Sequence, residues 1–288
     1  MKNLSIILTL TMSVFFKNLL AQESITLYPD GIPNQKTEIE TTNKVEFYYY
    51  KPEVQKSDKI FLIVPGGGYS RVAMGHEGHD VAKRLKDLGY VSFVLRYRLP
   101  VENEHVDKRV VPLQDAQYAL LYIKRNAKKL GYTYKQVGVL GFSAGGHLAS
   151  TLSTHYLQSQ VSDKIKKNEL RPDFSILVYP VITMDDKFTH KGSKTNLIGP
   201  NFKDEDVLRF SNEKNINKDT PPAYFVHAVD DKAVPIENSY LYQKELSKNN
   251  IPNDLYKYEK GGHGFGMVNK QEDGDWFSEM IKWINKLK

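Results

Sequence analysis

The chain has 288 residues, of which 40% are hydrophobic and 26% charged, with a formal net charge of +6 at pH 7 and no cysteine. This composition is typical of a soluble globular protein and excludes disordered chains, collagen-like repeats and a disulfide framework. Lysines are mixed with acidic residues, as in KRLKDL and DKIKKNEL. This pattern predicts a solvated surface and not a nucleic-acid-binding surface.

The first 21 residues have the pattern of a secretory signal peptide. Lys2 precedes the apolar run Leu4–Phe16, which is too short to span a bilayer comfortably, and Ala21 offers a small residue for cleavage. The leucine three residues before that cut is larger than preferred, so the cut position stays open and an uncleaved anchor is the alternative. We expect residues 1–21 to be removed, and residues 22–288 to form a single domain that is secreted or periplasmic, without stable membrane insertion.

Short β-rich runs alternate with amphipathic stretches along the rest of the chain. The predicted strands are residues 45–50, 59–64, 91–97, 136–141, 174–180, 223–228 and 254–259, and the predicted helices are 76–88, 112–130, 143–157, 236–249 and 275–287. This alternation indicates an α/β fold with a doubly wound, mostly parallel sheet and helices on both faces. Two irregular stretches, 98–112 and 181–222, are predicted to form walls of a substrate cleft.

The sequence GFSAG lies between the predicted strand 136–141 and the predicted helix 143–157. It matches G-x-S-x-G, in which the serine occupies a strained turn and the glycines keep neighbouring side chains away from its hydroxyl. The strand, turn and helix setting predicts that Ser143 is a nucleophile. A glycine-rich packing turn with a capping serine is the alternative.

A serine nucleophile requires a general base and a carboxylate that orients the base. His263 lies in the glycine-rich loop GGHGFG after the last predicted strand, and Asp230 and Asp231 follow the strand that ends at residue 228. We predict His263 as the base and one of the two adjacent aspartates, Asp231 or Asp230, as the orienting acid. The order serine, aspartate, histidine is the order found in α/β-hydrolases.

Three consecutive glycines in IVPGGGYS follow the second predicted strand. Their backbone N–H groups can approach a developing oxyanion, so we predict an oxyanion hole made by Gly67, Gly68 and the N–H of Ala144. Tyr69 is expected either to line the cleft beside them or to pack against the sheet. A dinucleotide- or phosphate-binding loop is disfavoured because G-x-G-x-x-G fails at Arg71.

The remaining histidines give weaker signals. His76 and His79, in HEGHD, lack the spacing of a zinc protease and a third ligand, so no metal site is predicted. His147 is expected to pack or to form hydrogen bonds on its helix. His190, in THKGS, belongs to the irregular stretch 181–222, from which it can reach the cleft.

These motifs together resemble the secreted bacterial α/β-hydrolases grouped with acetyl xylan esterases and feruloyl-esterase-like (BD-FAE-like) enzymes. The similar stretches are LYPDGIPN, PGGGY, LRYRLP, PLQDAQYAL, GFSAGGHLAS, YPVITM with THKGS, HAVDDKAVPIENS and EKGGHGFG, from about residue 27 to the last helix. One departure is Pro65, which stands where many related lipases have the histidine of H-G-G-G. It removes a side-chain support of the loop and leaves the backbone donors.

The resemblance implies a serine esterase that removes short acyl groups, chiefly acetyl, from a polysaccharide or oligosaccharide such as xylan, without a cofactor. It also implies that Ser143, Asp231 and His263 form the catalytic triad and that an acylated carbohydrate is the partner. The acyl group, the sugar and the oligomeric state stay open.

Two other functions are considered. A serine exopeptidase of the prolyl-oligopeptidase type is disfavoured because there is no room for a propeller domain before residue 45. A non-catalytic carbohydrate-binding module on a hydrolase scaffold is disfavoured because all three triad positions and the glycine loop occur together.

Overall fold

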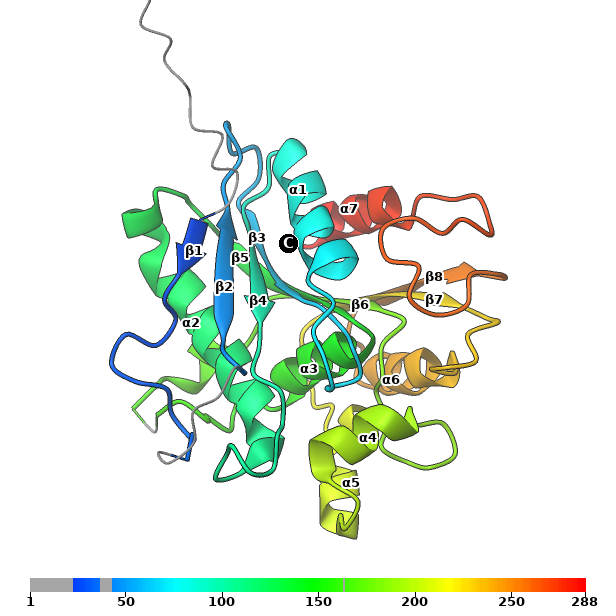
Figure 1. Ribbon diagram of the computed structural model, residues 1–288. Helices are drawn as coiled ribbons and strands as arrows, with labels where there is room; N and C mark the ends of the chain where they lie inside the picture. The colour runs from blue at the N-terminus through cyan, green and yellow to red at the C-terminus, as the bar shows by residue number, and fades with distance from the viewer. Residues whose placement is uncertain (1–22, 37–42, 163) are drawn as a thin grey trace, which may run out of the picture.

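The computed structural model describes residues 23–36, 43–162 and 164–288 (Figure 1). The predicted signal peptide, residues 1–21, lies outside the described residues. Within them, one sheet has the strand order β1-β2-β4-β3-β5-β6-β7-β8. The strands are β1 Glu23–Ile25, β2 Glu46–Tyr50, β3 Lys59–Val64, β4 Ser92–Arg96, β5 Gln136–Phe142, β6 Ser175–Val178, β7 Ala223–Ala228 and β8 Asn253–Tyr258.

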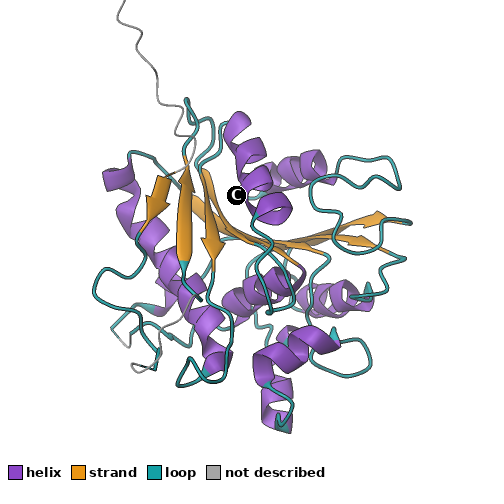
Figure 2. Ribbon diagram, viewed as in Figure 1, coloured by secondary structure: helices purple, strands orange, loops and turns teal. Residues whose placement is uncertain are grey.

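Helices cover both faces of this sheet (Figures 1 and 2). They are α1 Asp80–Asp87, α2 Val111–Leu130, α3 Ser143–Thr154, α4 Lys191–Ile198, α5 Asp204–Phe210, α6 Glu237–Lys248 and α7 Trp276–Lys286. A π-helical turn, Gly75–His79, leads into α1, and 3₁₀ turns occur at Lys108–Val110, Lys167–Leu170 and Asn212–Lys214.

Alternate residues of the buried strands contribute to two separate apolar cores. In β3, Ile60, Leu62 and Val64 belong to the core beneath α2, α3 and α6, whereas Phe61 and Ile63 belong to the core beneath α1 and α7. This alternation follows from the two-residue period of a strand. Since the central strands are covered on both faces, nearly every residue in them must be apolar, which is the pattern seen in the sequence.

The predicted fold class is confirmed. The pairs from β3 with β4 through to β7 with β8 are parallel, and only β1 with β2 and β2 with β4 are antiparallel among the described strands. Each predicted strand and helix is present, with ends within a few residues of those expected. Among the described residues, no helix combines the length and the apolar character needed to cross a membrane.

The stretch 181–222 is more regular than its sequence suggests, because it contains α4 and α5. These helices have eight and seven residues, which is too short for a clear amphipathic period. Tertiary contacts stabilise these helices. In α5, for example, Asp206 Oδ1 accepts from Arg109 Nη1 over 2.7 Å, which connects α5 to the irregular stretch 98–112.

The carboxyl ends of the parallel strands lie at one edge of the sheet, where Val64 pairs with Gly141 and Ala228 pairs with Tyr258. In an open α/β sheet this edge is where ligands bind. The loops that follow β3, β5, β7 and β8 therefore meet at one place, although their residues are far apart in the chain.

Candidate active site

The turn between β5 and α3 carries Ser143, whose φ of 51° lies in the left-handed region. This conformation is strained for a residue other than glycine and is typical of functional sites. The turn is also very tight: a Cβ on Gly145 would lie 2.1 Å from the carbonyl oxygen of Val64, and one on Gly141 would lie 2.3 Å from that of Gly145. Only glycine at these positions lets α3 approach the sheet so closely.

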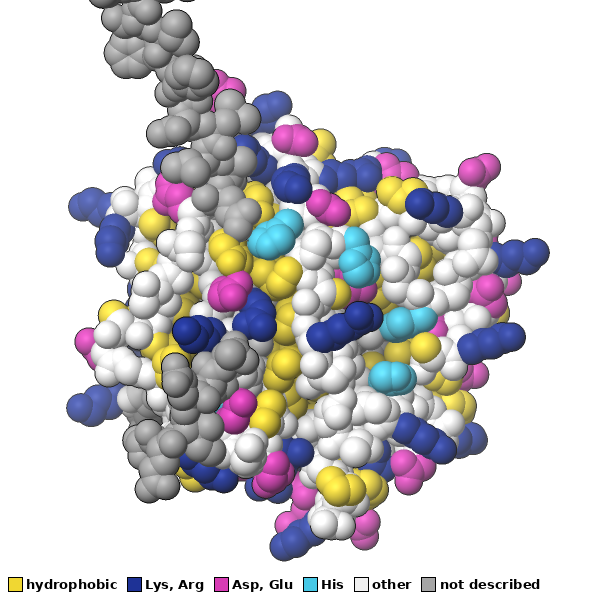
Figure 3. All heavy atoms as spheres, in the orientation of Figure 1, with side chains coloured by type: hydrophobic (Ala, Val, Ile, Leu, Met, Phe, Trp, Pro, Cys, Tyr) yellow, Lys and Arg dark blue, Asp and Glu magenta, His cyan; other side chains and the backbone are white. Residues whose placement is uncertain are grey.

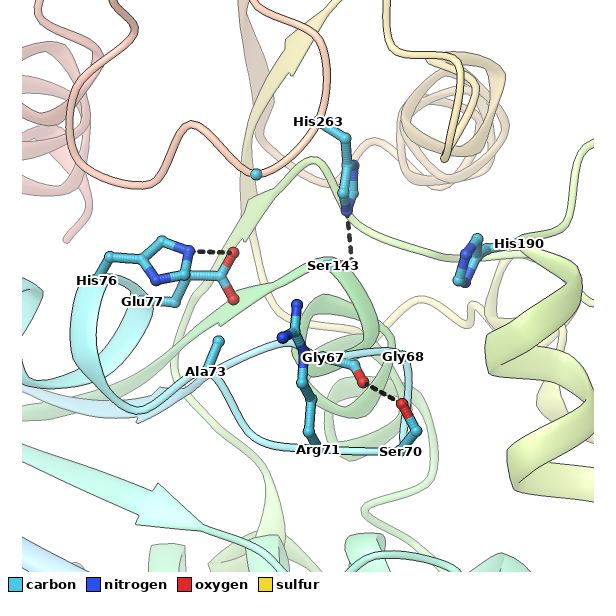
Figure 4. A pocket seen from close by; sticks show the side chains of 11 residues that line it. Gly67, Gly68, Ser70, Arg71, Ala73, His76, Glu77, Ser143, His190 and His263 are labelled. Atoms are coloured by element: carbon cyan, nitrogen blue, oxygen red, sulfur yellow. Dashed lines mark hydrogen bonds and ion pairs between the residues drawn. The ribbon is translucent and has the colours of Figure 1, made fainter.

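Ser143, His263 and Asp231 form one hydrogen-bonded line. Ser143 Oγ lies 2.8 Å from His263 Nε2 (Figure 4). His263 Nδ1 lies 2.7 Å from Asp231 Oδ2. An ionised carboxylate can only accept, so Nδ1 donates to Asp231 and Nε2 is left to accept the serine proton. Three loops distant in sequence thus bring together the three residues predicted as the triad.

The environment of Asp231 favours its ionised form. Burial opposes the charge, but interactions with His227 and His263 and a backbone hydrogen bond from Val234 outweigh it and lower the pKa of Asp231 from its ordinary value. Its Oδ1 accepts from the N–H groups of Ala233 and Val234, each over 2.9 Å. The carboxylate is therefore fixed in place and charged at neutral pH.

Asp230 has a different set of partners. Its Oδ1 accepts from the N–H groups of Gly261 and Gly262, over 2.9 and 2.8 Å. These two glycines directly precede His263. Of the two adjacent aspartates, Asp231 contacts the imidazole and Asp230 contacts the backbone that carries it.

The glycine loop lies against the serine. Gly67 and Gly68 line the same pocket as Ser143, and both have positive φ values, 126° and 65°. Since α3 begins at Ser143, the N–H of Ala144 belongs to the first helical turn and has no acceptor within the helix, and no side chain caps this end. The backbone of all three residues predicted to form the oxyanion hole is therefore beside the hydroxyl.

The side chain of Tyr69 does not line the pocket, which corrects one of the two expectations for it. Tyr69 is only 3% exposed, and its hydroxyl lies 2.8 Å from His147 Nδ1. His147 Nε2 lies 2.8 Å from the carbonyl oxygen of Phe210, so Nε2 donates and Nδ1 accepts from the tyrosine. Burial lowers the pKa of His147 to about 4, which keeps it neutral in this packed chain of contacts.

Glu77 and Tyr179 connect the glycine loop to the loop that carries His263, and no sequence motif had singled them out for this role. Glu77 is buried, and its Oε2 accepts from the N–H of Gly66 while its Oε1 accepts from the hydroxyl of Tyr179, each over 2.8 Å. The Tyr179 hydroxyl in turn accepts from the N–H of Gly266 over 3.0 Å, and its ring lies 4.8 Å from that of His263. The glycine loop and the histidine loop are therefore joined through one carboxylate.

The sequence around Glu77 and Tyr179 indicates regular secondary structure at both positions. Glu77 lies in HEGHD, at the start of the predicted helix 76–88, but this turn is π-helical and buries Glu77. Tyr179 falls at the end of a predicted strand, but the strand ends at Val178 and Tyr179 has a φ of 36°. Neither departure from regular structure has a sequence signature.

A pocket of about 470 Å³ opens above Ser143. Histidine side chains gather on this face of the molecule, between α1 and α4 as viewed in Figure 1 (Figure 3). Figure 4 shows His76 on one side of Ser143 and His190 on the other. The pocket is lined by Gly67, Gly68, Ser70, Arg71, Ala73, His76, Glu77, Ser143, His190, His263 and Gly264.

The doubly wound sheet and the serine on the turn after β5 define an α/β-hydrolase fold. Residues 48–246 match the BD-FAE family model, and the chain belongs to this family, as expected from the sequence.

Two curated relatives are similar in sequence to this chain over most of its length. The acetylxylan esterase of Xylanibacter ruminicola is 35% identical over 238 residues, which are 81% of this chain and 45% of the relative. The endo-1,4-beta-xylanase B of Butyrivibrio fibrisolvens is 34% identical over 236 residues, which are 80% of this chain and 35% of the relative. The chain thus spans less than half the length of these relatives.

A solved structure covers nearly the same length as this chain. The acetyl ester-xyloside bifunctional hydrolase from Caldicellulosiruptor lactoaceticus has a TM-score of 0.80 and 33% identity, and the match covers 92% of this chain and 96% of that one.

The bridge through Glu77 leads to a prediction about stability. Glu77→Ala leaves the Tyr179 hydroxyl and the Gly66 N–H buried without their acceptor, and each such group costs about 1–3 kcal/mol. We expect the free energy of unfolding, measured by urea denaturation, to fall by about 2–5 kcal/mol. Glu279→Ala is the control, since Glu279 pairs with the exposed Lys282. Equal stability of the two variants would contradict the role given to Glu77.

Proposed function

We propose that the protein is a serine esterase that removes short acyl groups, chiefly acetyl, from a polysaccharide or oligosaccharide such as xylan. The observation that carries this proposal is the hydrogen-bonded line from Ser143 through His263 to Asp231, which opens into a pocket beside the glycine loop. Membership of the BD-FAE family and the likeness to an acetylxylan esterase and an acetyl ester-xyloside hydrolase support the choice of substrate class.

In the first half of the proposed reaction, Ser143 Oγ attacks the carbonyl carbon of the ester while His263 Nε2 takes the serine proton. The charge that develops on the carbonyl oxygen is stabilised by the N–H groups of Gly67, Gly68 and Ala144. One such donor typically lowers the barrier by about 2.7–4 kcal/mol. The ionised Asp231 stabilises the imidazolium that forms.

The tetrahedral intermediate then collapses. The bond to the sugar oxygen breaks, His263 donates its proton to that oxygen, and an acyl-serine remains. In the second half, water gives a proton to His263 and attacks the acyl carbon, and collapse of this intermediate returns the proton to Ser143 and frees the carboxylic acid. The residues named so far and water supply every proton transfer.

The composition of the pocket favours a small acyl group on a polar alcohol. Among the described residues that line it, Ala73 has the only wholly apolar side chain, and the others are glycine, serine, histidine, arginine or glutamate. A feruloyl group or a fatty acyl chain would need an apolar or aromatic wall for its burial. An acetyl group requires little apolar surface, and the polar side chains suit the hydroxyl groups of a sugar.

The same pocket disfavours an exopeptidase that acts at the amino end of its substrate. Such an enzyme needs a carboxylate to bind the free amino group. The carboxylate lining this pocket is Glu77, and both of its oxygens already accept hydrogen bonds from Gly66 and Tyr179.

Replacing the proposed nucleophile tests the chemistry. Ser143→Ala is expected to lower turnover of 4-nitrophenyl acetate by about 10⁴-fold or more and to abolish labelling by a fluorophosphonate probe. The control is Ser70→Ala, another serine of the pocket, which must still be labelled. A Ser143→Ala protein that keeps its turnover would contradict the esterase proposal, and a wild type that is never labelled would favour a binding module.

The acyl group is identified by measuring the release of acetate from acetylated xylan and of ferulate from feruloylated xylan. We expect the wild type to release acetate.

The two adjacent aspartates give a matched pair of variants. Asp231→Asn removes the charge that holds His263 in the required tautomer, so turnover is expected to fall by about 10⁴-fold. Asp230→Asn keeps an oxygen that can accept from Gly261 and Gly262, so its turnover is expected to fall far less. The measurement is the kcat of each variant on 4-nitrophenyl acetate, and the reverse order would identify Asp230 as the orienting acid.

We also propose that the protein is exported, that residues 1–21 are its signal peptide and that residues 22–288 form the single catalytic domain. Lys2, the apolar run that follows it and Ala21 support this. Expression of the whole gene in a bacterial host is expected to yield a periplasmic or secreted protein whose N-terminal sequence starts near Gln22. An intact N-terminus on cytoplasmic protein alone would contradict it.

A further inference from the structure

The imidazole of His190 is held in one tautomer. His190 precedes α4 as its N-terminal capping residue, and its Nδ1 accepts from the N–H of Ser193 over 3.2 Å. The hydroxyl of Ser193 lies 2.8 Å from the same nitrogen. A neutral imidazole has one donor and one acceptor, so a ring that accepts at Nδ1 carries its proton on Nε2.

The same helix is attached to the glycine loop. Asn196 Nδ2, one turn further along α4, donates to the carbonyl oxygen of Gly68 over 2.8 Å. A Cβ built on Gly68 would meet His190 Cε1 at 3.7 Å, which is ordinary van der Waals contact. His190 is therefore placed directly beside the loop that faces Ser143, and it lines the pocket (Figure 4).

The ring is a neutral donor. Burial, and after it the neighbouring His263, lower the pKa of His190 from its ordinary value. Among the described residues, Nε2 of His190 makes no hydrogen bond. The pocket thus contains an uncharged N–H group that is held in place and has no protein acceptor.

The partner of this group follows from its chemistry. A fixed neutral donor suits an uncharged oxygen, whereas a carboxylate or phosphate would favour a charged partner. His190 and His263 line the same pocket, with His190 beside the glycine loop. In the proposed reaction, His263 protonates the oxygen of the departing alcohol, so a donor that shares its pocket can reach a hydroxyl group next to that oxygen.

We propose that His190 Nε2–H donates a hydrogen bond to a hydroxyl oxygen of the sugar, next to the acylated position. The subsite is formed by α4 and the glycine loop, and it makes the enzyme select acylated sugars over simple acyl esters. This inference rests on the proposed esterase function.

The test removes each partner of the hydrogen bond in turn. The substrates are a methyl xyloside acetylated at one hydroxyl and the analogue in which the neighbouring hydroxyl is replaced by hydrogen. For the wild type, kcat/KM is expected to be about 2- to 10-fold higher for the sugar with the hydroxyl, the range of an ordinary hydrogen bond. In His190→Ala this ratio is expected to fall to about one, and His190→Gln, which can still donate through its amide, is expected to recover part of it.

Two control variants separate this effect from a general disturbance. Lys191→Ala changes an exposed residue of α4 outside the pocket lining and is expected to leave the ratio as in the wild type. His76→Ala changes a histidine on the other side of Ser143 and is also expected to keep the ratio. Turnover of 4-nitrophenyl acetate reports whether each variant is folded, and its loss in His190→Ala is expected to be smaller than the loss on the hydroxyl-bearing sugar.

Each other outcome overturns the subsite. The subsite is wrong if His190→Ala keeps the wild-type ratio or if the wild type shows no preference between the two sugars. It is also wrong if His190→Ala loses equal activity on both sugars and on 4-nitrophenyl acetate, a result that would assign His190 to the reacting centre. The failure of the esterase proposal looks different, since the wild type would then release acetate from no substrate.

Discussion

The close contact of α3 with the ends of β3 and β5 is the constraint on which the rest of the site depends. The carbonyl oxygen of Val64 lies where a side chain at position 145 would be, so the helix can take this position only above a glycine. The tight turn places Ser143 in a left-handed conformation at the first position of the helix. As a result its hydroxyl faces the pocket, and the first N–H groups of the helix, which have no acceptor within the helix, lie beside it. The cost of the strained φ is offset by the packing of the glycines around it.

Around this turn, each loop is held by contacts that do not belong to the proposed chemistry. Asp230 fixes the backbone before His263, and Glu77 holds Gly66 and Tyr179 together. Tyr179 then packs against the ring of His263. Acceptors that serve backbone N–H groups in this way restrict the loops without adding bulk to the pocket. A serine and an imidazole can thus stay within 2.8 Å although 120 residues separate them.

The stretch 181–222 contributes His190 to the pocket, whereas none of the described residues that line it comes from 98–112, which corrects the expectation that both stretches form walls of the cleft. The stretch 181–222 contacts the glycine loop through Asn196 and the stretch 98–112 through Asp206. The last residue of α5 also contacts α3, where the carbonyl oxygen of Phe210 accepts from His147. The reacting groups come from loops that directly follow strands, whereas His190, which we infer to contact the sugar, comes from this insertion. Catalysis and substrate choice are thereby assigned to different parts of the chain.

The sequence by itself determined the fold class and pointed to Ser143 and His263, because these depend on local patterns. Continuous apolar strands require a sheet covered on both faces, and GFSAG and GGHGFG each combine a reactive side chain with glycines after a strand. It also placed Asp231 and Asp230 at the right loop, but only the tertiary structure showed that Asp231 reaches the imidazole and that Asp230 binds the loop backbone. The structure alone decided the burial of Tyr69, the Glu77 bridge, the helices α4 and α5, and the tautomer of His190. These features arise from contacts between residues far apart in the chain. The local sequence around one residue of such a pair does not predict which residue it contacts.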